Sequence, residues 1–129
     1  MLRFPGMPLC ISIPAPTGAL SILRTMVLTA GADLDLSVDT LDDLALAVHE
    51  VAVQLVERGA NRLDMGAAPV PGGLRVMVGG DVALDSWPDP GWEHTPAGRI
   101  VCGLAGSVEH GADSIGSFAA LAAAGGPAR

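Results

Sequence analysis

The chain has 129 residues and a formal net charge of −7, so it fits one domain of ordinary size and presents a surface that repels nucleic acid. Half of its residues are hydrophobic, but only two Phe, two Trp and no Tyr contribute aromatic rings, which predicts an aliphatic core and excludes an aromatic platform for stacking bases. No apolar run approaches the roughly 18 residues of a transmembrane helix, and prolines and a glycine interrupt residues 1–13, where a signal peptide would need an apolar core; we expect a cytoplasmic protein with no membrane partner.

The first predicted elements are a strand and a helix that follow a loose lead. Residues 1–8 contain two prolines and a glycine and are expected to form a flexible lead. Residues 9–13 are apolar, partly alternating and followed by a proline, a pattern typical of a strand. Thr17 is expected to cap a helix over residues 19–30, which ends at a glycine.

The clearest signal is a long amphipathic helix over residues 40–58. Its apolar residues recur at helical spacing and form one continuous stripe. We expect Asp39 or Thr40 to be the N-cap and Gly59 to end the helix. The stripe consists of Leu41, Leu44, Val48, Val51 or Ala52, and Leu55.

The rest of the chain predicts two strands, a long loop, a third helix and a final strand. The strands lie at residues 62–68 and 74–78, the loop at 79–95, the helix at 96–107 and the last strand at 114–123. The loop is expected to serve as a functional loop or a lid. Its tryptophans, Trp87 and Trp92, either pack inward or form exposed partner contacts.

This order of elements predicts an α/β fold. We expect a two-layer sandwich in which helices cover mainly one face of a mixed β-sheet. One domain would span residues 9–123, between the lead and a flexible tail of residues 124–129. Cys10 and Cys102 are expected to be reduced and buried.

Several segments, taken in order, resemble one protein family. They are ISIPA at residues 11–15 with LSILR at 20–24, DLALAVHEV at 43–51, and GLAGSV at 103–108. The chain resembles the RsbW-type anti-sigma factors of actinobacteria, which are serine-protein kinases of the histidine-kinase-like (GHKL) ATPase superfamily with a Bergerat-type fold. The resemblance implies a transcription regulator that sequesters a sigma factor. It also implies homodimers, and phosphorylation of an anti-anti-sigma (STAS) antagonist with ATP and Mg²⁺.

Two residues of the long helix match catalytic positions of that family. Glu50 occupies the position of the catalytic base, which orients the attacking hydroxyl and accepts its proton. The alternative for Glu50 is a solvated side chain on the polar face. Gln54 stands where the family has an Asn that binds Mg²⁺. Because its amide oxygen is one methylene further out, we expect weak or absent Mg²⁺ binding.

The other candidate ATP-binding residues lie in and after the long loop. Asp81 is the candidate adenine-reading carboxylate, but Ala83 and Asp85 replace the two glycines that should follow it. Gly98 is the candidate phosphate-lid glycine, and Arg99 is a candidate phosphate contact. A loop carboxylate with no ligand and a solvent-facing arginine are the alternatives for Asp81 and Arg99.

The resulting expectation is an anti-sigma regulatory protein that binds a sigma factor, its anti-anti-sigma antagonist or both, with reduced or lost kinase activity. An active serine kinase is the first alternative. A structural or interaction domain with only a superficial likeness to the family is the second. The chain lacks the spacing of a zinc site, and we expect no direct contact with nucleic acid.

Overall fold

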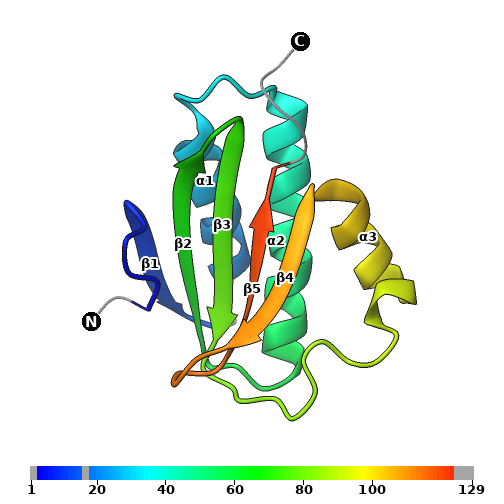
Figure 1. Ribbon diagram of the computed structural model, residues 1–129. Helices are drawn as coiled ribbons and strands as arrows, with labels where there is room; N and C mark the ends of the chain where they lie inside the picture. The colour runs from blue at the N-terminus through cyan, green and yellow to red at the C-terminus, as the bar shows by residue number, and fades with distance from the viewer. Residues whose placement is uncertain (1–2, 16–17, 124–129) are drawn as a thin grey trace.

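A five-stranded sheet with two long helices on one face forms the framework of the computed structural model (Figure 1). The structure describes residues 3–15 and 18–123. In chain order the elements are β1 (Leu9–Pro14), α1 (Ala19–Gly31), α2 (Val38–Glu57), β2 (Arg62–Val70), β3 (Gly73–Gly80), the 3₁₀ turn η1 (Trp92–His94), α3 (Pro96–Leu104), β4 (Ser107–Ala112) and β5 (Ser117–Ala122).

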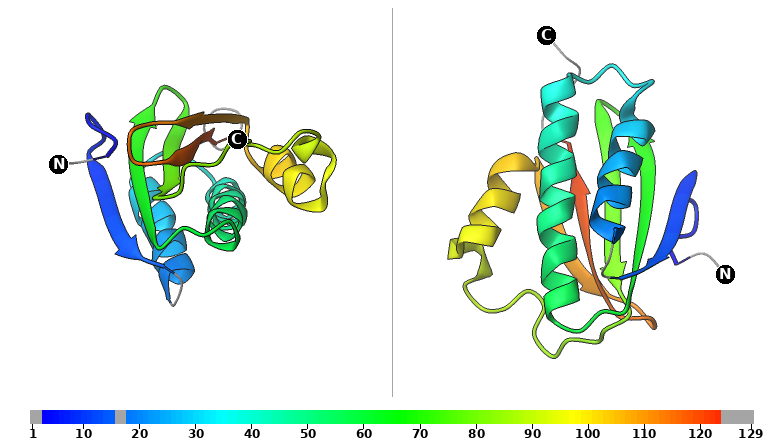
Figure 2. Two further views of the ribbon diagram at one scale, coloured as in Figure 1. Left: turned by 90° about the horizontal axis from the view of Figure 1, so that it is seen from below. Right: turned by 180° about the vertical axis from the view of Figure 1, so that it is seen from behind.

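The strands follow the order β1-β2-β3-β5-β4, and every neighbouring pair is antiparallel. The α/β class and the placement of α1 and α2 on one face are confirmed (Figure 2), but the predicted mixed sheet is wrong. The strands of the hairpins β2–β3 and β4–β5 are antiparallel, as the short turn of a hairpin requires. The connection from β1 to β2 runs through α1 and α2, and β2 pairs antiparallel with β1.

The stripe predicted on the long helix forms the centre of the core. Leu44, Val48, Val51 and Leu55 are fully buried between α2 and the sheet. The predicted N-cap is wrong, because α2 begins at Val38 and the hydroxyl of Ser37 accepts a hydrogen bond from the Thr40 amide at 3.0 Å.

Two glycines set the ends of the helices. Gly59 follows α2 with a φ of +108°, a conformation that residues with a side chain rarely adopt. Gly18 precedes α1 with a φ of +77°, while the predicted cap Thr17 lies outside the described residues.

The second half of the chain holds one strand more than predicted. Helix α3 stops at Leu104 rather than at residue 107, because Ala105 is extended, and β4 follows at once. The last strand begins at Ser117 and not at residue 114, since residues 113–116 turn between β4 and β5.

The segment of residues 3–8, which we call the strap, lies on the sheet face that the helices leave open. It belongs to the part of the chain predicted to be a flexible lead, yet Phe4 is 4% exposed. Its ring meets that of Phe118 edge-on, with centroids 6.0 Å apart. The strap is therefore packed, while residues 1–2 and the predicted tail of residues 124–129 lie outside the described residues.

Both cysteines are free: Cys10 is half-buried and Cys102 is exposed, so the prediction of burial is wrong for Cys102. In the part of the chain that the structure describes, no helix combines the length and the apolar character needed to cross a membrane.

Candidate functional site

Helix α2 places the two candidate catalytic residues on one face. Glu50 and Gln54 are four residues apart, so they are neighbours along the helix surface. Both are half-buried. Gln54 lies on the side of α2 that faces η1 and α3, because its side chain contacts Trp92.

The amide of Gln54 is engaged by a tryptophan. The indole Nε1 of Trp92 donates a hydrogen bond to Gln54 Oε1 at 3.1 Å, and Trp92 is 9% exposed. The oxygen that would bind Mg²⁺ is thus covered by a buried indole. The other end of the amide, Gln54 Nε2, is buried without a partner among the residues described.

A glycine lets Trp92 lie against α3. A Cβ atom on Gly98 would collide with the Trp92 carbonyl oxygen. The Gly98 amide donates to the Thr95 hydroxyl at 3.1 Å, and that hydroxyl donates to the Trp92 carbonyl at 2.6 Å. The amide predicted to contact a phosphate is therefore used to cap α3, and Arg99 beside it is exposed.

A histidine of β4 completes this group of side chains. His110 meets the rings of Trp92 and Trp87 edge-on, with centroids 4.6 and 5.2 Å apart. Trp87 is held in turn by a 2.7 Å hydrogen bond from its Nε1 to the Phe118 carbonyl. We call Gln54, Trp87, Trp92 and His110 the tryptophan cluster.

Burial lowers the pKa of His110, which favours a neutral ring between the two indoles. Its Nε2 is buried without a partner in the described chain, like Gln54 Nε2. Both unpaired atoms belong to side chains that contact Trp92. Ring packing and the two tryptophan hydrogen bonds thus hold the cluster, and two of its polar atoms have no partner among the described residues.

Asp81 does not join the tryptophan cluster. Its Oδ1 accepts hydrogen bonds from the amides of Asn61 and Arg62, at 2.7 and 3.1 Å. Burial alone would raise the pKa of Asp81, but these amides and the Arg62 charge hold it below its ordinary value. Through its Oδ1, the carboxylate predicted to read adenine joins the end of β3 to the start of β2.

A pocket of about 210 Å³ opens beside the cluster, between α2, the loop and the start of α3. At its rim, the Arg58 guanidinium donates to Asp89 at 2.9 Å. The pocket is lined by Gln54, Glu57, Arg58, Trp87, Asp89, Trp92, Thr95 and Ala97.

The candidate ATP-site residues are not gathered around this pocket, because only Gln54 among them lines it. The pocket is smaller than the roughly 300 Å³ at which small-molecule sites begin, and it is lined by neither Glu50 nor Asp81. Gln54 and Gly98 are brought together, but around Trp92 and not around an open phosphate site. Over residues 3–15 and 18–123, no group of three or more His, Cys, Asp or Glu side chains is placed to hold a metal.

Sequence reasoning left open whether the tryptophans pack inward, and it assigned His110 no partner. Two tryptophans within six positions of an aromatic-poor chain were the available signal for the cluster. No family model and no curated protein sequence matches the chain.

Proposed function

We propose that this domain is a regulatory protein of the anti-sigma type that works by binding protein partners and does not use ATP. Its partners would be a sigma factor, an anti-anti-sigma antagonist or both. The support is the combination of the motifs around Glu50 with the order of elements, in which a strand, two helices and a hairpin precede α3 and a second hairpin. A GHKL-like fold, a cytoplasmic location and homodimers are parts of the same proposal.

One observation carries the nucleotide-independent part of the proposal. Trp92 donates to the amide oxygen of Gln54, and its indole occupies the space beside that oxygen. Mg²⁺ requires near-ideal octahedral geometry and tolerates little displacement of its ligands. A hydrogen bond from the indole competes with a metal ion for this oxygen, which supports a function of α2 that does not depend on nucleotide.

The charge of the chain indicates the kind of partner. A net charge of −7 attracts a basic protein surface and repels another acidic one. A partner that presents arginine or lysine side chains would associate faster at low ionic strength than at high ionic strength.

Calorimetric titration with millimolar ATP, with and without Mg²⁺, tests the first half of the proposal. We expect no binding heat from the folded domain. The competing function is an active serine kinase. Mg²⁺-dependent binding, followed by phosphate transfer to an anti-anti-sigma protein that Glu50→Ala abolishes, would establish that kinase and contradict the proposal.

Affinity capture from the native cytoplasm tests the second half. We expect mass spectrometry to identify a sigma factor or a STAS-type antagonist among the captured proteins. Recovery of neither would count against an anti-sigma role and would favour a purely structural domain.

A further inference from the structure

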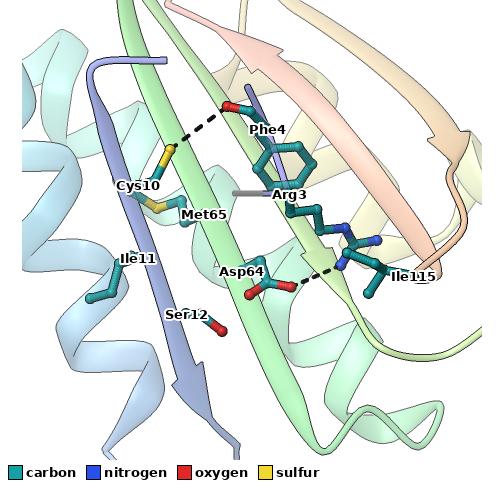
Figure 3. Close-up of a pocket in the computed structure, with 8 residues that line it drawn as sticks. All are labelled: Arg3, Phe4, Cys10, Ile11, Ser12, Asp64, Met65 and Ile115. Carbon is teal, nitrogen blue, oxygen red and sulfur yellow. Dashed lines mark hydrogen bonds and ion pairs between the residues drawn. The ribbon is translucent and has the colours of Figure 1, made fainter. Parts of the chain in front are cut away.

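The open face of the sheet holds a buried arginine from the strap. The side chain of Arg3 is 3% exposed. Its Nε donates to Asp113 at 3.0 Å, and its Nη1 lies 3.3 Å from Asp64 (Figure 3). The same guanidinium donates to the carbonyls of Gly80 and Ser117, at 2.9 and 3.3 Å. We call these two carboxylates and two carbonyls the arginine cradle.

The sheet beneath the strap is shaped for these side chains. A Cβ atom on Gly79 would lie 2.7 Å from the Arg3 guanidinium carbon. A Cβ atom on Gly66 would lie 2.5 Å from the Met7 sulfur and 3.2 Å from Phe4. The absence of side chains at both glycines lets the arginine and the following phenylalanine lie directly on the strands.

The strap does not fill this face. A pocket of about 250 Å³ remains beside Arg3. Figure 3 shows Ile115 next to the guanidinium and Ser12 on β1, close to Asp64. Besides these, the lining includes Phe4, Cys10, Ile11 and Met65. The face therefore keeps an open pocket beside the strap.

We propose that the arginine cradle is a docking site for an arginine followed by an aromatic residue on a protein partner, and that Arg3 and Phe4 occupy it until the strap lifts. When Arg3 leaves, the carboxylates of Asp64 and Asp113 lose the cation that neutralises them. An arginine of the partner would restore these ion pairs. This inference rests on the proposed partner-binding function and names the surface and the chemistry that the partner presents.

Competition within the chain regulates access to the cradle. The strap belongs to no helix or strand, so it can open locally while the sheet stays paired. The apparent affinity for a partner is the intrinsic affinity reduced by the fraction of molecules with the strap lifted. The strap therefore lowers binding without touching the tryptophan cluster on the other side of the sheet.

A peptide with the sequence of residues 1–8 is the probe for the cradle. We expect the full chain carrying Arg3→Ala and Phe4→Ala to bind the fluorescently labelled peptide saturably in an anisotropy titration. A peptide with alanine in place of the arginine should bind about tenfold more weakly or worse. Adding Asp64→Asn should weaken binding likewise, whereas Glu109→Gln, an equal charge change on an exposed residue of β4, should not.

Trypsin tests the lifting of the strap in the unmodified chain, and does not depend on how the double variant folds. Cleavage after Arg3 requires that its buried side chain leave the cradle. We expect this cleavage to proceed in native buffer at a rate that low concentrations of urea leave unchanged, as local opening predicts. A cleavage rate that follows global unfolding would make the strap a fixed part of the core and overturn the proposal.

Different results would contradict the cradle proposal and the anti-sigma proposal. Saturable binding that is equal for both peptides would overturn the cradle, as would no binding by a folded double variant. A captured sigma factor or antagonist could bind the double variant with equal affinity whether or not it also carries Asp64→Asn. That result would support the anti-sigma role and contradict the cradle. If no such partner is found while the peptide binds with the expected selectivity, the result supports the cradle and contradicts the anti-sigma role.

Discussion

Trp92 and Gln54 form a hydrogen bond that should matter most when only one partner is removed. Trp92→Phe would leave Gln54 Oε1 without its donor, and Gln54→Met would leave the buried indole without its acceptor. Each single change is expected to lower the free energy of unfolding by about 1–3 kcal/mol. The double change should cost less than the sum of the two, because it removes both partners and also the unpaired Gln54 Nε2.

Urea unfolding of the four proteins in this cycle gives the coupling between the two side chains. If the losses in free energy of unfolding of the single variants add up to that of the double variant, the hydrogen bond contributes nothing. If Gln54→Met leaves the free energy of unfolding unchanged, the indole finds another acceptor.

Helix α3 offers two glycines with opposite expected behaviour. Alanine normally stabilises a helix relative to glycine by about 0.5–1 kcal/mol. At Gly98 the added Cβ would collide with the Trp92 backbone, so Gly98→Ala should instead destabilise the protein, by about 1–3 kcal/mol. At Gly103 no atom lies within 4 Å of such a Cβ, so Gly103→Ala is the matched control and should be stabilising.

Thermal or urea unfolding of both variants measures the difference. If Gly98→Ala were as stable as Gly103→Ala, η1 would not be held against α3 by the close approach at Gly98. Gly98 would then be open to the phosphate-lid role that the sequence suggested.

At the scale of the whole molecule, local patterns were predictable and contacts between distant segments were not. The buried stripe of α2 follows from helical spacing alone, as does the shared face of Glu50 and Gln54. Strand β4 was missed because Ser-Val-Glu-His-Gly-Ala contains few strand-forming residues and is held by its pairing with β5.

The contacts of the strap and of the tryptophan cluster could not be predicted from the sequence, for the same reason. Arg3 is buried among partners that lie far along the chain, from Asp64 at 61 positions to Ser117 at 114 positions. Trp92 meets Gln54 across 38 positions. No periodicity marks such pairs, so the sequence predicted a flexible lead where the fold has a packed arginine.

The strap and the tryptophan cluster together predict how stability depends on pH. Burial lowers the pKa of His110 below its ordinary 6.5, so the unfolded chain takes up a proton first as the pH falls. The free energy of unfolding should therefore decline from about pH 6.5 and level off below the folded pKa of His110. His110→Gln should remove this phase, whereas His94→Gln, at an exposed histidine of η1, should leave it in place.

A second loss of stability is expected below about pH 4. Burial by itself would raise the pKa of Asp113, but hydrogen bonds from Arg3 and the amides of Gly116 and Ile115 hold it below its ordinary 3.8. Because a depressed carboxyl pKa stabilises the folded state above that value and ceases to do so as the carboxyl is protonated, the arginine cradle should fail in acid. Urea titrations at pH values from 3 to 8 would show both phases, and Asp113→Asn should diminish only the lower one. A single phase at low pH would mean that His110 is hydrated, and that the space between the two indoles is open to water.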